Sequence, residues 1–96
     1  KRLKQYNGIA EQSNNKEILD AILLLARTEG IFTEPAGGVS VAVLKKMVED
    51  GKIDKDETTV CYVTGNGLKA TESLMEVLPK PQVMQADVAK ISAVVK

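Results

Sequence analysis

Two short segments of this 96-residue chain combine glycines with polar side chains that could contact a ligand. Residues 34–38 read Glu-Pro-Ala-Gly-Gly, and residues 64–69 read Thr-Gly-Asn-Gly-Leu-Lys. Glycines let backbone amides come close to a bound group, and in open α/β sheets ligands bind where strands end. Neither segment matches a phosphate-binding loop or a dinucleotide fingerprint, and each by itself is also compatible with a simple tight turn.

The remaining reactive side chains narrow the possible chemistry. The chain has no histidine, which excludes histidine-based triads and two-histidine metal sites. Its single cysteine, Cys61, has no partner for a disulfide or a zinc site, so we interpret it as a small buried apolar residue in a protein of the reducing cytoplasm. No lysine, Lys69 included, lies in an apolar stretch that would keep its amine neutral for a Schiff base. We therefore predict no catalytic residue and no metal ligand in this chain.

Length and charge limit the chain to one small domain. Ninety-six residues are enough for a single modest hydrophobic core. Thirteen basic and thirteen acidic residues give a formal net charge of zero, so we expect neither nucleic acid nor a membrane as a partner. Because the first residue is Lys1, we interpret residues 1–96 as a single excised fragment of a longer protein.

Two helices are predicted around the first glycine segment. Asn14 is a good N-cap with Glu17 three residues later, and the nearly all-apolar run at residues 18–26 predicts a helix that closes at Gly30. Residues 35–38 are expected to form a turn. Apolar residues then recur at helical spacing from Val39 to Val48, although Val39, Val41 and Val43 also alternate as in a strand.

Strands are predicted at residues 9–12, 31–33 and 58–63. The last of these is an almost continuous run of β-forming residues, which is typical of a central parallel strand. It leads directly into the second glycine segment. A short helix at residues 71–77 and a terminal helix at 86–95 complete the pattern. The expected fold class is α/β, a partial parallel sheet flanked by helices.

The two glycine segments and their surroundings resemble a known family. Residues 28–46, followed some twenty residues later by residues 63–69, are similar to the C-terminal region of the threonine synthase family, and the resemblance spans roughly residues 8–70. This family belongs to the fold-type II pyridoxal-phosphate enzymes, whose large domain is tryptophan synthase β-like. The resemblance implies that the chain is the C-terminal part of that cofactor-binding domain.

The resemblance also implies roles for three residues. Thr64 matches the position whose hydroxyl hydrogen-bonds the pyridine nitrogen of pyridoxal phosphate, and Gly65 matches the neighbouring backbone position beside the ring. Glu34 matches an acidic residue near the cofactor, and a solvated loop carboxylate is an equal alternative. The family's Schiff-base lysine and phosphate-binding glycine loop lie N-terminal of this region, so the chain alone is expected to be inactive.

The resemblance implies an enzyme that converts O-phospho-L-homoserine and water to L-threonine and phosphate. Its partners would be the N-terminal remainder of the chain, a small-molecule substrate and further copies in a homo-oligomer. Two alternatives stay open. One is another fold-type II enzyme, a threonine or serine dehydratase or a cysteate synthase, and the other is a non-enzymatic interaction module.

Overall fold

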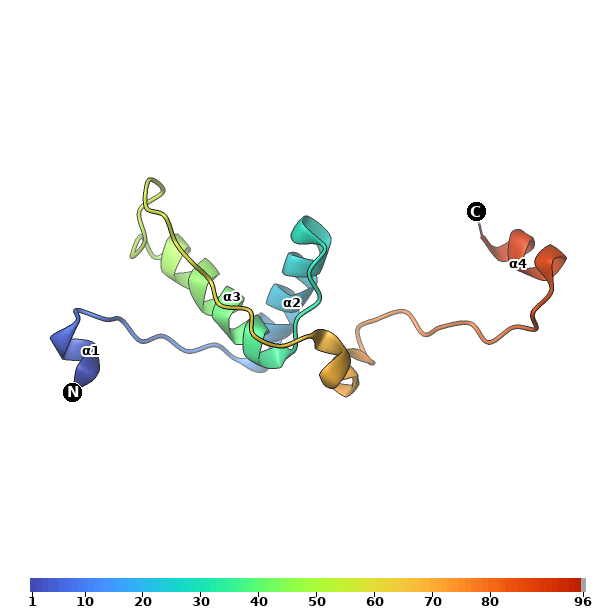
Figure 1. The fold of residues 1–96 in the computed structure, drawn as a ribbon, viewed down its shortest axis with the longest axis horizontal. Helices are drawn as coiled ribbons and strands as arrows, with labels where there is room; N and C mark the ends of the chain where they lie inside the picture. Colours follow the sequence, from blue (N-terminus) through green and yellow to red (C-terminus); the bar gives the residue numbers. More distant parts are fainter. Residues whose placement is uncertain (96) are drawn as a thin grey trace.

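The computed structural model describes residues 1–95 and is dominated by two helices that pack against each other (Figure 1). In chain order the elements are α1 (Arg2–Gln5), α2 (Asn15–Glu29), α3 (Pro35–Glu49), the 3-10 helices η1 (Gly67–Lys69) and η2 (Thr71–Leu74), and α4 (Val88–Val94). A turn follows α1, with Asn7 at a φ of 51° and the Gly8 amide donating to the Leu3 carbonyl at 2.7 Å. Among residues 1–95, no helix is long and apolar enough to cross a membrane.

Helix α2 begins and ends where the sequence predicts. The Glu17 amide donates to Asn14 Oδ1 at 2.9 Å, and the Asn14 amide donates to Glu17 Oε2 at 2.8 Å, so the capping box is confirmed. At the other end, Gly30 adopts the left-handed conformation with a φ of 67°. The largely apolar helix is only partly covered, because Ala21 and Ile22 are its two buried residues.

Helix α3 begins four residues earlier than predicted. Its N-cap is Glu34 and Pro35 is the first helical residue, so the prediction of a turn at residues 35–38 was wrong. The fixed φ of proline suits the first helical position, where the missing amide hydrogen has no helical acceptor. The alternative strand from Val39 to Val43 is not formed. The helix ends at Glu49, and Gly51 follows two residues later in the left-handed conformation with a φ of 68°.

Helices α2 and α3 form a V whose arms meet near the start of both helices (Figure 1). Gly38 makes this close approach possible. A Cβ at Gly38 would lie 2.7 Å from Ile22 Cγ1 and 3.0 Å from Ile18 Cγ2. Ile22 is 1% exposed, and Ala21 and Ala42 are buried beside it. The core of the helix pair is therefore small and depends on the small residues Gly38, Ala21 and Ala42.

An ionic cluster ties the extended segment before α2 to the end of α3. Lys52 Nζ lies 3.0 Å from Glu11 Oε2 and 3.3 Å from Asp50 Oδ2, and Lys46 Nζ donates to the Gln12 carbonyl at 3.2 Å. Hydrogen bonds from the Gln12 amide and from Lys52 lower the pKa of Glu11. Hydrogen bonds to Glu11 and then Asp50 raise the pKa of Lys52.

The predicted parallel sheet is not formed within residues 1–95. Residues 9–12 and 58–63 are extended and make no ladder with any strand, and residues 31–33 contribute one isolated bridge, Thr33 with Asn66, which is antiparallel. A β-former run needs a neighbouring strand to satisfy its amides and carbonyls, and the described chain offers none at these positions. The segments predicted as strands at residues 9–12 and 58–63 are therefore extended but not paired into a sheet.

The C-terminal quarter leaves the helix pair as an arm (Figure 1). The predicted helix at residues 71–77 is shorter and of 3-10 type, and Leu74 in it is 1% exposed. The predicted terminal helix is confirmed in shortened form as α4, where Asp87 Oδ1 accepts from the Ala89 amide at 2.9 Å. The radius of gyration is 18.2 Å. A compact domain of this length would have about 12.5 Å, so the chain is far from globular.

Candidate functional site

The two glycine segments lie side by side in the structure. The Glu34 amide donates to the Gly65 carbonyl at 3.1 Å, and the Gly67 amide donates to the Phe32 carbonyl at 3.0 Å. These two hydrogen bonds frame the bridge between Thr33 and Asn66. The sequence analysis expected parallel strands to bring the segments together, whereas a short antiparallel crossing does so. We call residues 32–34 and 64–67 the rim.

Gly65 is buried beneath the Glu34 side chain. A Cβ at Gly65 would overlap the Glu34 carboxylate and lie 2.7 Å from its Cγ. Its φ is not in the left-handed region, so space and not backbone conformation explains the glycine. Glu34 itself is half-buried, and its side chain does not cap α3. The structure thus places two of the three predicted site residues in direct contact.

Thr33 is a rim residue that the sequence analysis did not identify. Its side chain is completely buried, and its single hydroxyl proton is shared between the Gly65 carbonyl, 3.1 Å from Oγ1, and the Glu34 carbonyl, 3.2 Å from Oγ1. A Cβ at Gly37 would overlap Thr33 Oγ1 and lie 3.0 Å from Thr33 Cβ. The only signal in the sequence was a threonine directly before the Glu-Pro pair.

The far end of the rim is packed against an aromatic ring. A Cβ at Gly67 would lie 2.6 Å from the Phe32 ring, so the backbone there lies directly against that ring. Asn66 Oδ1 accepts from the Leu68 amide at 2.8 Å and so starts η1. The exposed Lys69 ends this 3-10 turn.

Thr64 stands at the exposed edge of the rim. It follows the extended segment 58–63 and directly precedes the buried Gly65. Within the part of the chain that the structure describes, its hydroxyl has no hydrogen-bond partner and remains available to a bound group. The three predicted site residues are therefore neighbours, with Thr64 open to solvent and Glu34 and Gly65 in contact behind it.

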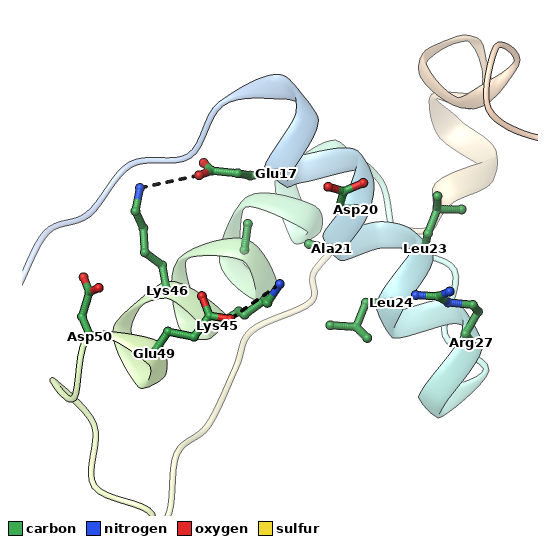
Figure 2. Close-up of a pocket in the computed structure, with 11 residues that line it drawn as sticks. Glu17, Asp20, Ala21, Leu23, Leu24, Arg27, Lys45, Lys46, Glu49 and Asp50 are labelled. Carbon is green, nitrogen blue, oxygen red and sulfur yellow. Dashed lines mark ion pairs between the residues drawn. The ribbon is translucent and has the colours of Figure 1, made fainter.

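A separate hollow of about 640 Å³ lies between α2 and α3 and includes none of the rim residues (Figure 2). Its apolar part is formed by small and aliphatic residues such as Leu23 and Leu24. One ion pair joins the two helices at its edge, with Lys46 Nζ 3.8 Å from Glu17 Oε1, and another lies within α3, with Lys45 Nζ 3.7 Å from Glu49 Oε1. Within residues 1–95, no cluster of acidic or cysteine side chains is arranged to hold a metal ion.

Comparison with known proteins shows the family. Residues 1–65 match the family described as pyridoxal-phosphate dependent enzyme, which is more than half of the chain. The chain belongs to this family. The resemblance recognised from the two glycine segments and the expected cofactor of the family are thereby confirmed.

Three similar relatives of this chain are all threonine synthases. The chain is 43% identical over 89 residues to a threonine synthase of Methanocaldococcus jannaschii, covering 93% of this chain and 22% of the relative. It is 43% identical over 82 residues to a threonine synthase of Halalkalibacterium halodurans, covering 84% and 23%. A threonine synthase of Bacillus sp. is 50% identical over 66 residues, covering 69% and 19%. The chain thus spans about a fifth of the length of the curated relatives it matches.

The rim fits the edge of a pyridoxal-phosphate site in its chemistry. The unpartnered Thr64 hydroxyl can exchange a hydrogen bond with a ring nitrogen. The volume that a Gly65 side chain would fill is taken by the Glu34 carboxylate, so the Thr64 hydroxyl is the group of the rim that lies open to a ligand. No other described residue of the rim offers an amine or a cation, so the rim by itself would supply only one wall of such a site.

Proposed function

We propose that this chain forms the C-terminal part of the cofactor-binding domain of a threonine synthase. That enzyme would convert O-phospho-L-homoserine and water to L-threonine and phosphate. The observation that carries the proposal is the bridged rim, which holds Glu34 against Gly65 and leaves Thr64 open. The identity of 43% over 93% of the chain to a threonine synthase supports the choice of reaction.

Thr64 would set the electronic character of the cofactor ring. When bound, pyridoxal phosphate would supply an electron sink for the reacting substrate. The Thr64 hydroxyl ionises only at high pH, so it does not hold the ring nitrogen in a fully protonated state as a carboxylate would. A threonine at this position therefore moderates the electron demand on the substrate.

Glu34 and Gly65 would shape the wall next to the ring. The Glu34 carboxylate occupies the volume that a side chain at position 65 would fill. It would therefore support the backbone segment that carries Thr64. Removing the carboxylate would leave a gap at this contact and loosen the segment that carries Thr64.

The rest of the enzyme would complete the fold as well as the site. Val60 and Tyr62 on the extended segment 58–63 are 73% and 77% exposed, and this β-forming run has both backbone edges free in the described chain. We infer that it becomes a strand of a parallel sheet supplied by further polypeptide. The amine that binds the cofactor and the groups that hold both phosphates would come from the same source, so the chain alone would be inactive. The enzyme is also proposed to be a homo-oligomer.

The proposal is tested in the full-length enzyme with three variants of Thr64. Thr64→Ala should weaken cofactor binding and slow threonine formation, because the ring nitrogen loses its partner. Thr64→Ser, which keeps the hydroxyl, should stay close to wild type. Thr64→Asp should shift the cofactor absorbance and change how the reaction partitions, because a carboxylate strengthens ring protonation. Unchanged cofactor affinity and activity in Thr64→Ala would refute the assignment.

The substrate is tested separately. O-phospho-L-homoserine should be consumed with release of phosphate, whereas threonine or serine should give no rapid deamination. The opposite preference would identify a dehydratase that shares the same rim.

A further inference from the structure

Thr33 connects the two halves of the rim from inside. Its hydroxyl, 0% exposed, reaches the Gly65 carbonyl at 3.1 Å across 32 positions of sequence. The same carbonyl accepts the Glu34 amide at 3.1 Å. The Thr33 hydroxyl, whose one proton also faces the Glu34 carbonyl at 3.2 Å, and the Glu34 amide thus converge on the Gly65 carbonyl and restrain the peptide plane that follows Gly65.

This hold matters because the restrained residue is a glycine. Gly65 has no side chain to limit its own φ and ψ, so contacts from elsewhere must determine how the chain passes through it. Thr64 lies immediately before Gly65, is exposed, and makes no side-chain hydrogen bond within residues 1–95. The direction of the Thr64 hydroxyl therefore depends on the orientation of its neighbour.

We propose that Thr33 is a positioning residue for the cofactor site: its buried hydroxyl orients Gly65 so that Thr64 points at the pyridine nitrogen. The inference rests on the proposed function of Thr64. Gly37 is part of the same device, because a Cβ at that position would overlap Thr33 Oγ1 and displace it from the Gly65 carbonyl. Thr33 touches neither cofactor nor substrate in this proposal and acts through Gly65.

The test uses full-length holoenzyme and the matched pair Thr33→Val and Thr33→Ser. Valine keeps the shape and loses the donor, whereas serine keeps the donor. Losing one hydrogen bond of about 0.5–1.5 kcal/mol corresponds to roughly two- to tenfold weaker binding of pyridoxal phosphate in Thr33→Val, together with a shifted cofactor absorbance. Thr33→Ser should retain the wild-type absorbance. Thr28→Val is the control, because the Thr28 hydroxyl donates to Leu24 in its own helix, away from the rim.

The readouts separate positioning from simple stabilisation. The unfolding midpoint of the cofactor-free enzyme reports stability, and the absorbance and affinity of bound pyridoxal phosphate report the geometry at Thr64. If Thr33→Val lowers only the midpoint and leaves both cofactor readouts as in wild type, the proposal is overturned. Should Thr33→Val fail to fold, Gly37→Ala carries the test, and an unchanged cofactor spectrum there overturns the proposal equally.

Including Thr64→Ala in the same series separates the positioning role of Thr33 from the proposed role of Thr64 itself. A change in Thr64→Ala without one in Thr33→Val removes the positioning role and leaves the proposed function standing. No change in Thr64→Ala removes the proposed function itself.

Discussion

Replacing Gly38 by alanine tests how α2 and α3 pack, and the sign of the result is informative. The added Cβ would lie 2.7 Å from Ile22 Cγ1, 3.0 Å from Ile18 Cγ2 and 3.1 Å from the Ile18 carbonyl oxygen. Ile22 is 1% exposed, and the carbonyl belongs to the backbone of α2. The two helices must therefore move apart to admit one methyl group.

Two opposing effects determine how far the stability changes. Overfilling a packed contact costs about 1–3 kcal/mol. Replacing glycine by alanine within a helix stabilises it by about 0.5–1 kcal/mol. We expect the steric clash to outweigh the gain in helix propensity, so Gly38→Ala should lower the free energy of unfolding by about 1 kcal/mol.

The assay is urea unfolding of the purified protein, followed by far-ultraviolet circular dichroism. Ala36→Gly, at an exposed position in the first turn of α3, measures helix propensity without a packing change. In an Ile22→Ala background, Gly38→Ala should become less harmful, because the most crowded neighbour has been removed. A gain of about 0.5–1 kcal/mol from Gly38→Ala alone would refute the reasoning, because it would mean that propensity dominates and the helices separate at no cost.

Three further predictions concern the helix cap, the ionic cluster and the uncovered apolar surface. Asn14→Ala should lower the free energy of unfolding by about 1 kcal/mol and fray the start of α2, seen as faster amide exchange, because the Glu17 amide loses its acceptor; unchanged exchange at Glu17 would contradict the capping box. The lowered pKa of Glu11 stabilises the folded chain above its unfolded pKa of about 4.3, and this stabilisation is lost as the pH falls through the folded pKa. The raised pKa of Lys52 stabilises the folded chain below its unfolded pKa of about 10.4, and this stabilisation is lost as the pH rises through the folded pKa. Lys52→Met should therefore weaken both pH dependences in unfolding titrations, and an unaltered acid limb and alkaline limb would count against the cluster. The chain on its own should self-associate, because its largely apolar α2 is poorly covered, and light scattering that gives a strict monomer at high concentration would contradict this.

Local signals predicted the helices well because their causes lie within a few residues. The Asn14–Glu17 capping box and the glycine at position 30 define both ends of α2, and each acts through hydrogen bonds or backbone conformations next to it in sequence. The start of α3 was missed because glycines at positions 37 and 38 suggested a turn. In the structure these glycines serve packing, against Thr33 and against Ile22.

The strands show the limit of such signals. Residues 58–63 have the composition of a central strand and adopt extended backbone, yet a sheet is a relation between segments and needs partners that no local pattern supplies. The candidate site was predicted in part. The sequence pointed to Glu34, Thr64 and Gly65, and its only signal for the buried Thr33 was the position of that threonine directly before the Glu-Pro pair.

The sequence by itself determined the helix boundaries set by caps, the absence of histidine chemistry and, through its two glycine segments, the membership of the pyridoxal-phosphate dependent enzymes. Tertiary structure alone decided that the Glu34 carboxylate covers Gly65, that Thr33 hydrogen-bonds the same residue, and that the segments cross as an antiparallel bridge. The physical reason is distance along the chain. Capping acts over three or four residues, whereas these contacts join positions more than thirty residues apart.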